Sequence, residues 1–169
     1  LFSLTRDAIA GSKQPVDLVL WPETAYPQSL DPWFATNIFY QKLADFNRNL
    51  GVPFIIGAYS DDPPTQTNPK NFNAMFTVHQ GQMLEPYYRK HILLAFGEYF
   101  PGGEYFPFLT KLIPEISNFG RGLGPTQMIL NSVKFAPLIC YEILEPLYVA
   151  RSVNLGSQII VNVTNDSWF

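Results

Sequence analysis

The sequence predicts a mixed α/β domain in which strands alternate with helices and hairpins. The chain has 169 residues, of which 47% are apolar and only 15% are charged, so it can bury a sizeable core. This composition excludes a disordered chain. Short apolar runs alternate with amphipathic segments, as in layered α/β folds. The chain starts without Met in a helix-like segment, and we expect it to be part of a longer protein.

The first part of the chain predicts two buried strands separated by a helix. Val16–Trp21 is an apolar run that stops at Pro22, so Glu23 should project from the carboxyl end of a strand. Enzymes of the α/β class place their catalytic groups at such ends. An Asp-Pro pair at the start and a glycine at the end predict an amphipathic helix over residues 31–51. Val52–Tyr59 should form the second buried strand.

The middle of the chain predicts a hairpin followed by a long loop region. Asn73–His79 and Gln82–Tyr88 flank a Gln-Gly turn, and Lys90 follows the second arm. Residues 91–125 are too long for an ordinary connection, which indicates a functional loop region. Within it, Gly120–Gly124 lacks the lysine and hydroxyl residues of a phosphate-binding loop, so we interpret it as flexible backbone.

The last part predicts a second hairpin that leads to the single cysteine. Thr126–Leu130 and Val133–Ile139 form its arms, and Cys140 follows directly. A helix over Glu142–Leu155 and a strand over Gln158–Val163 complete the pattern. Between a strand and a helix start, the unpaired N–H groups of the first turn would stabilise a thiolate at Cys140.

Charge and residue usage exclude several classes of function. A net charge of −3 without a basic cluster argues against nucleic acid as a partner. One cysteine cannot form an internal disulfide, and His79 and His91 lack the companions of a metal site, so we expect neither a metal nor a cofactor. No stretch approaches the roughly 18 to 20 apolar residues that cross a bilayer, so the chain as written should be soluble.

Three residues are candidates for catalysis, and each has an ordinary structural alternative. Cys140 is either a nucleophile or an inert core thiol. Glu23 is either a partly desolvated base or a capping or surface carboxylate. Lys90 is either a site residue or a solvated surface charge. Glutamate is the preferred base for the thiol because His79 lies within a hairpin and His91 lies beside a lysine.

Four motifs in order make the pattern specific: Trp21–Ala25, Arg89–Pro101, Ile139–Glu142 and Asn165–Phe169. In this order they resemble the nitrilase superfamily, and their flanking residues resemble its apolipoprotein N-acyltransferase family. The resemblance implies a four-layer αββα sandwich over residues 1–169. It also implies that the sandwich is incomplete here, because in that family the catalytic domain continues further and is accompanied by membrane-spanning helices.

The resemblance also implies roles for individual residues. Glu23, Lys90 and Cys140 match the catalytic triad of the superfamily. Glu98 matches a further essential carboxylate near the lysine, and the residues that match positions around the thiol and the acyl groups are Tyr141, Glu142 and Trp168. For Glu98 and Glu142, orientation of the lysine through an ion pair is an alternative role.

The function implied by the resemblance is maturation of bacterial lipoproteins. A fatty acyl group would pass from a phospholipid to Cys140 as a thioester, and then to the N-terminal α-amine of a diacylglyceryl-cysteine apolipoprotein. The enzyme would lie in the inner membrane with its catalytic domain facing the periplasm. A soluble amidase that uses water as second nucleophile is one alternative. A non-catalytic module that binds an acyl chain or a protein partner is another, although retention of all three polar groups argues against it.

Overall fold

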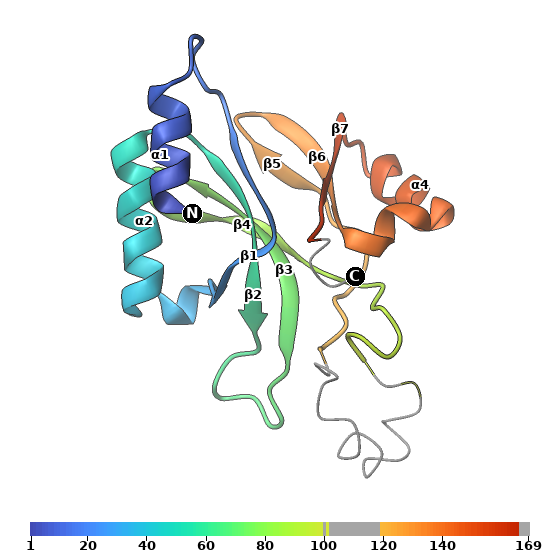
Figure 1. Ribbon diagram of the computed structural model, residues 1–169. Coiled ribbons are helices and arrows are strands. Elements are labelled where there is room, and N and C mark those ends of the chain that lie inside the picture. Colours follow the sequence, from blue (N-terminus) through green and yellow to red (C-terminus); the bar gives the residue numbers. More distant parts are fainter. Residues whose placement is uncertain (100, 102–118, 166–169) are drawn as a thin grey trace.

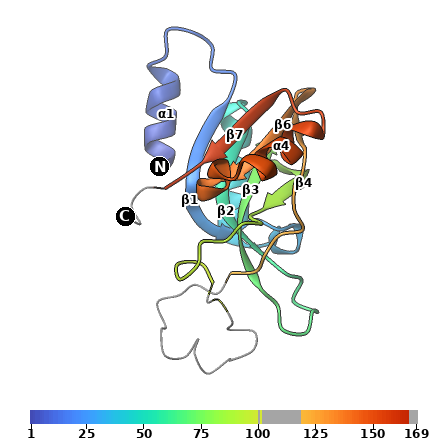
Figure 2. The same ribbon diagram turned by 90° about the vertical axis from the view of Figure 1, so that its right-hand side faces the viewer.

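The described part of the protein forms four layers in the order helix, sheet, sheet, helix. The computed structural model describes residues 1–99, 101 and 119–165. Helices α1 and α2 cover the outer face of the first sheet, and the second sheet carries α4 on its far side (Figure 1). Seen from the α4 side, this helix stands in front of the strands (Figure 2). The mixed α/β fold and the layer order agree with the sequence-based prediction.

The first sheet contains four strands in the order β1-β2-β3-β4. β1 runs parallel to β2, whereas β2, β3 and β4 are antiparallel to one another. The predicted hairpin is present, and Gln80 and Gly81 adopt the positive φ angles of 51° and 76° that its two-residue turn requires. The strands are β1 Val19–Ser29, β2 Phe54–Asp61, β3 Asn71–His79 and β4 Gln82–Arg89.

Helices α1 (Phe2–Ala10) and α2 (Ile38–Leu50) pack an aromatic cluster against this sheet. Phe2 and Trp21 rings lie 5.6 Å apart, and the Trp21 indole donates to Thr5 Oγ1 at 3.0 Å. In the described part of the chain, no helix is long and apolar enough to span a membrane.

The predicted helix over residues 31–51 is divided into two pieces. Asp31 is the N-cap residue before Pro32, as predicted, but its side chain makes no capping hydrogen bond. Its carboxylate instead accepts hydrogen bonds from Ser60 Oγ and the Asp61 N–H, both at 2.7 Å. Only a short 3-10 turn, η1 (Pro32–Phe34), follows Asp31. The helix proper, α2, starts at Ile38 after the N-cap residue Asn37, whose side chain accepts from the Phe39 N–H. It is closed by Gly51, as predicted.

The second sheet contains three strands in the order β5-β6-β7, with β6 antiparallel to β5 and parallel to β7. The predicted helix over residues 142–155 is also divided. Glu145 is extended at φ −102° and ψ 90° because the residue before a proline is disfavoured in the helical region, and Pro146 starts α4. The elements are β5 Met128–Leu130, β6 Val133–Ile139, η2 Cys140–Leu144, α4 Pro146–Asn154 and β7 Ile159–Val163.

The two sheets pack through a second apolar core. Its members come from strands of both sheets and are nearly or fully buried, as expected for interdigitated inner faces. They are Ile55, Met75, Tyr88, Met128, Leu130, Phe135, Ile139 and Val163.

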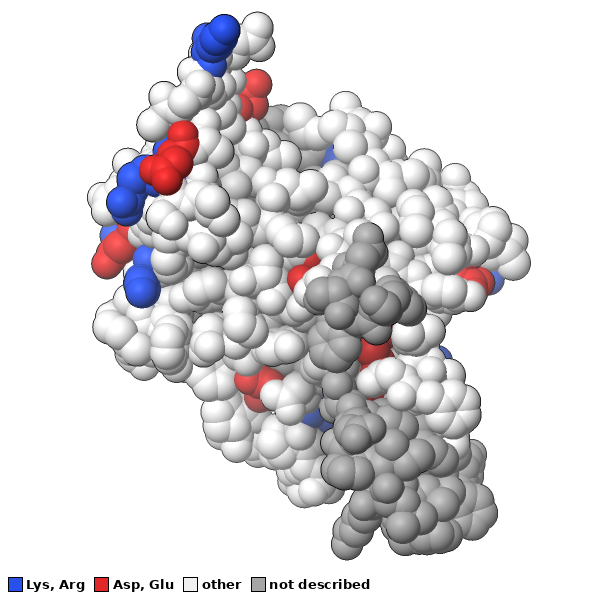
Figure 3. Space-filling model, in the orientation of Figure 1, with Lys and Arg blue, Asp and Glu red and all other residues white. Residues whose placement is uncertain are grey.

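Charged side chains gather along the edge of the molecule that α1 and α2 form, whereas few are visible over the second sheet (Figure 3). Both signs of charge occur on this edge, which is typical of the solvated faces of amphipathic helices. The exposed residues there include Arg6, Asp7, Lys42, Asp45 and Arg48.

Strand β1 does not end at Pro22, in contrast to the prediction. Its pairing with β2 breaks after Trp21, resumes at Tyr26 and continues toward Ser29, so Glu23 lies in a bulge within the strand. Proline interrupts the ladder because it lacks an N–H group, yet an extended chain can resume beyond it. Gly57 on β2 makes room for the bulge, since a Cβ atom there would lie 2.3 Å from the Pro22 carbonyl oxygen.

We predict that Gly57→Ala destabilises the protein and displaces Glu23. The added methyl group would lie 2.6 Å from the Glu23 Cα atom, and we expect overpacking to lower the free energy of unfolding by about 1 to 3 kcal/mol. Urea titration followed by tryptophan fluorescence measures this loss. The control Gly11→Ala, at an exposed position, should change the free energy by less than about 0.5 kcal/mol. Equal effects of the two substitutions would contradict the tight bulge.

Candidate active site

The three candidate residues line one cavity of about 130 Å³. Glu23 comes from the bulge of β1, Lys90 follows β4, and Cys140 follows β6, so both sheets contribute. The structure therefore brings together the three residues that the sequence analysis expected to lie in one site. The described residues that line the cavity are Glu23, Thr24, Tyr59, Asn73, Lys90, Leu94, Gly97, Glu98, Phe119, Cys140 and Asn165.

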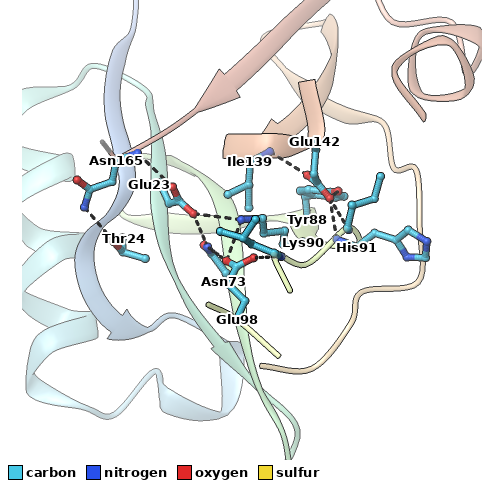
Figure 4. A network of polar contacts seen from close by, with 12 residues as sticks. Glu23, Thr24, Asn73, Tyr88, Lys90, His91, Glu98, Ile139, Glu142 and Asn165 are labelled. Atoms are coloured by element: carbon cyan, nitrogen blue, oxygen red, sulfur yellow. Dashed lines mark hydrogen bonds and ion pairs between the residues drawn. The ribbon is translucent and has the colours of Figure 1, made fainter. Parts of the chain in front are cut away.

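Lys90 is a buried cation rather than a surface charge. Its residue is 1% exposed, and its Nζ atom lies 2.8 Å from Glu98 Oε1 and 3.4 Å from Glu23 Oε1 (Figure 4). Its main-chain N–H donates to the Asn73 carbonyl oxygen at 2.8 Å, which fixes the backbone at the end of β4. Burial alone would lower the pKa of Lys90, but the anionic Glu98, followed by Glu23 and Cys140, raises this pKa above its ordinary value. Lys90 is therefore positively charged at neutral pH.

Glu23 is 5% exposed and held at both carboxylate oxygens, so it is not a surface carboxylate. Oε1 accepts from the Asn73 side-chain amide at 2.6 Å, and Oε2 accepts from the Asn165 N–H at 3.1 Å. Its neighbour Thr24 has a φ of 50°, which is unfavourable for a β-branched residue. The bulge therefore holds the Glu23 carboxylate beside the cavity, and the backbone at Thr24 is strained as a result.

Glu98 is the second carboxylate beside the ammonium group of Lys90, and it lies below Glu23 in the close view of the site (Figure 4). Oε1 accepts from Lys90 and, at 3.2 Å, from the Asn73 amide, while Oε2 accepts from the Leu94 N–H at 2.9 Å. The ion pair with Lys90 that the sequence suggested for Glu98 is present.

Asn73 is the principal site residue that the sequence analysis missed. It is 2% exposed, and its single amide group donates to both carboxylates that flank the ammonium group of Lys90. A buried polar side chain must find partners, so an asparagine within the apolar strand β3 was the available signal.

Cys140 is partly exposed and has a φ of 55°, so it is not sealed in the hydrocarbon core. It begins the five-residue 3-10 helix η2 rather than the α-helix that the sequence predicted. Tyr141 follows with 42% exposure, and its main-chain N–H lies in a first helical turn, where such groups have no partner within the helix.

Glu142 is fully buried and does not pair with Lys90, in contrast to the proposed ion pair. Its carboxylate instead accepts from Tyr88 Oη at 2.6 Å and from three main-chain N–H groups (Figure 4). Burial raises the pKa of Glu142, and these hydrogen bonds oppose the shift. The three N–H donors are those of His91 at 2.8 Å, Ile92 at 2.9 Å and Ile139 at 2.9 Å.

Glu142 thereby joins the segment after Lys90 to the turn that carries Cys140. Tyr148 on α4 extends this contact, because its hydroxyl lies 2.8 Å from the Tyr88 hydroxyl. Burial raises the pKa of both tyrosines, so both hydroxyls stay protonated and can donate hydrogen bonds. The closing motif is described only as far as Asn165, and Trp168 lies outside the described residues.

Within the described ranges, no group of three His, Cys, Asp or Glu residues could hold a metal ion. His91 makes other contacts, since its Nδ1 lies 2.6 Å from the Gly122 carbonyl oxygen and its ring stacks on Tyr148. The cavity offers a thiol, two carboxylates and an ammonium group, which suits covalent catalysis at a carbonyl carbon.

Sequence comparison identifies the class of protein to which this fold and this site belong. The profile of the family described as carbon-nitrogen hydrolase matches residues 1–169. The chain therefore belongs to the carbon-nitrogen hydrolase family.

Two curated relatives of the chain carry the same name. The apolipoprotein N-acyltransferase of Bdellovibrio bacteriovorus is 46% identical over 160 residues, which cover 90% of this chain and 29% of the relative. The apolipoprotein N-acyltransferase of Chlorobaculum tepidum is 30% identical over 200 residues, covering 100% of this chain and 35% of the relative. The chain thus spans about a third of the length of these relatives.

Solved structures place the chain in the nitrilase-like fold. A carbon-nitrogen hydrolase from Helicobacter pylori matches with a TM-score of 0.64 and 17% identity, over 96% of this chain and 52% of that one. A variant of the Nesterenkonia sp. AN1 amidase matches with a TM-score of 0.63 and 18% identity, over 96% and 57% of the chains. That variant carries the acetamide moiety of fluoroacetamide covalently added at its active-site cysteine.

We predict that Glu98→Gln shifts the alkaline limit of stability to lower pH. The pKa of Lys90 in the folded protein lies above the value of 10.5 in the unfolded chain. The charged form therefore stabilises the fold at pH values below 10.5, and this contribution is lost as the pH rises through the folded-state pKa. Removing the nearest anion lowers the pKa of Lys90, and the unfolding free energy near neutral pH should fall by about 1 to 3 kcal/mol.

Urea titrations between about pH 7 and 11 measure this shift. Glu85→Gln, which removes an exposed carboxylate from β4, is the matched control and should leave the alkaline limit unchanged. An alkaline limit that is the same in Glu98→Gln as in the wild type would show that Glu98 does not hold the charge of Lys90.

Proposed function

We propose that this chain is part of the catalytic domain of an N-acyltransferase that works through a thioester on Cys140. The observation that carries the proposal is the buried ammonium group of Lys90 between two carboxylates, in the same cavity as the only cysteine of the chain. In this assignment Glu23 is the base, Lys90 stabilises negative charge and Cys140 is the nucleophile. Glu98, Tyr141 and Glu142 support them, and Trp168 contributes to substrate binding.

In the first half-reaction, Glu23 accepts the thiol proton of Cys140 and the thiolate attacks the ester carbonyl of a phospholipid. The oxygen of the tetrahedral intermediate is stabilised by the ammonium group of Lys90 and the main-chain N–H of Tyr141. Contacts of this kind are worth about 3 to 4 kcal/mol per donor. The intermediate collapses by breaking the ester C–O bond, and Glu23 returns the proton to the departing lysophospholipid oxygen.

In the second half-reaction, the α-amine of a diacylglyceryl-cysteine apolipoprotein attacks the thioester carbonyl. Glu23 accepts the proton from the attacking amine and returns it to the sulfur as the C–S bond breaks. Lys90 keeps its charge throughout, which agrees with the upward shift of its pKa. The products are an N-acylated lipoprotein and the free Cys140 thiol.

The names of the relatives support an acyltransferase, and with it a phospholipid donor and an apolipoprotein acceptor. By the same argument we place the full protein in the bacterial inner membrane, with this domain on the periplasmic side.

A second candidate is an amidase that uses the same residues with water as second nucleophile. It is favoured by the fold likeness to the Nesterenkonia sp. AN1 amidase. Incubation of the natural full-length protein with a phospholipid and a diacylglyceryl-cysteine peptide distinguishes the two. The acyltransferase gives an N-acylated peptide, whereas the amidase releases free acid from a small amide and leaves the peptide unchanged.

We predict that Cys140→Ala abolishes the acyl-enzyme, because it removes the thiol that lines the cavity. Intact-mass measurement after incubation with a phospholipid should show an acyl adduct in the wild type, released by neutral hydroxylamine, and no adduct in the variant. Glu23→Gln should form the adduct about 10² to 10⁴ times more slowly, since it lacks the base. An adduct of undiminished yield in Cys140→Ala would rule out the assignment.

A further inference from the structure

The cavity has a polar wall and an aromatic wall. The polar wall contains the charged groups and Asn73 described above. The aromatic wall contains Tyr59 and Phe119, whose ring centroids lie 5.8 Å apart, and Leu94 completes the apolar part of the lining. Tyr59 stands directly opposite Asn73 in the pairing of β2 with β3, so their side chains share one face of the sheet. The aromatic wall therefore begins next to the groups that hold Glu23 and Glu98.

Phe119 is tied by main-chain hydrogen bonds to the segments that carry the charged groups. Its N–H donates to the Glu98 carbonyl oxygen at 2.8 Å, and the Gly122 N–H donates to the Lys90 carbonyl oxygen at 2.8 Å. Between them, the Gly120 N–H donates to the Asn71 carbonyl oxygen at 2.7 Å. These hydrogen bonds fix the main chain at Phe119 relative to the segments that carry Glu98 and Lys90.

Two glycines of this segment, Gly120 and Gly122, are required by close packing, which corrects the interpretation of the segment as flexible backbone. Gly124 is not packed in this way, because a Cβ atom there would meet no atom within 4 Å. A Cβ atom at Gly120 would lie 2.4 Å from the Phe72 ring, and one at Gly122 would lie 2.0 Å from the Arg89 carbonyl oxygen. The Phe72 ring cannot easily yield, because the residue is 6% exposed and the Arg89 guanidinium group lies 4.0 Å above the ring. Residues 119–122 thus form a close-fitting strap over the ends of β3 and β4.

The cavity is too small for a long fatty acyl chain. Its volume of about 130 Å³ is close to that of engineered cavities, about 150 Å³, that hold a single benzene molecule. It accommodates the reacting carbonyl group and the first few carbons, while the rest of a long chain must lie outside it. Selection by this cavity therefore acts on the carbons next to the carbonyl group.

We infer that Tyr59 and Phe119 form a subsite for the first carbons of the acyl group and exclude acyl groups that are branched next to the carbonyl carbon. The inference rests on the proposed acyl transfer and specifies the class of acyl group that it accepts. We expect the methyl group of such a branch to meet this aromatic wall, because the cavity has a volume of only about 130 Å³. In hydrophobic pockets one misplaced methyl or methylene group changes rates by about 10- to 200-fold.

The test compares p-nitrophenyl octanoate with p-nitrophenyl 2-methyloctanoate as acyl donors to the natural full-length protein. The rate of nitrophenolate release and the mass of the Cys140 adduct are measured for each ester. Each rate is divided by the rate of the same ester with N-acetylcysteine, which removes the intrinsic difference in reactivity. The wild type should prefer the straight chain by at least about 10-fold.

Phe119→Ala should reduce this preference at least about 5-fold while it still forms the octanoyl adduct, because the aromatic wall is opened and the charged groups are untouched. The matched control is Leu123→Ala, from the same stretch of chain, whose side chain is fully exposed and should not affect the preference. Should Phe119→Ala fail to fold, Tyr59→Ala on β2 opens the same wall and carries the same expectation.

The inference is overturned if the wild type acylates Cys140 equally fast from both esters, or if the opened variant keeps the full preference. Either result leaves the proposed thioester chemistry in place. If neither ester labels Cys140 in the wild type, the proposed function and the subsite fall together.

Discussion

The site depends on one buried cation and the two carboxylates that hold it. Lys90 is 1% exposed, so its charge is tolerated only because Glu98 and Glu23 lie at 2.8 and 3.4 Å. Removing one partner of such a group leaves an uncompensated charge away from water, which is strongly destabilising. Asn73 donates to both carboxylates and Lys90 donates its N–H to the Asn73 carbonyl oxygen, so one strand position orders all three charges.

Two strained backbone positions connect this charged group to the rest of the fold. Thr24 and Cys140 have φ angles of 50° and 55°, conformations that cost about 1 to 3 kcal/mol for residues other than glycine. The first lies in the β1 bulge, which Gly57 accommodates, and the second lies where β6 gives way to η2. The carboxylate of Glu142 joins the two sheets at this point, because it binds the segment after Lys90 and the end of β6. The surrounding structure thus sustains strain at the cavity.

Apolar periodicity predicted the strands. The layer order and the meeting of Glu23, Lys90 and Cys140 were implied by the resemblance of the motifs to the nitrilase superfamily. Prediction from the sequence failed where side chains make contacts that are distant in the chain. Asp31 occupies the predicted N-cap position before Pro32, but its carboxylate binds β2. Glu142, for which an ion pair with Lys90 was one alternative, binds main-chain N–H groups instead. Asn73 and the strap of residues 119–122 were missed, since their importance follows from packing that no local pattern encodes.

The most direct test of this account is the pKa of the Lys90 ammonium group, measured by NMR titration of the Nζ resonance in lysine-labelled protein. The account predicts that Lys90 titrates above its ordinary value of 10.5 and is fully charged at neutral pH. A pKa below 10.5 would show that burial outweighs the two carboxylates. A pKa below neutral pH would mean that Lys90 is uncharged there and that the buried cation on which the site depends does not exist.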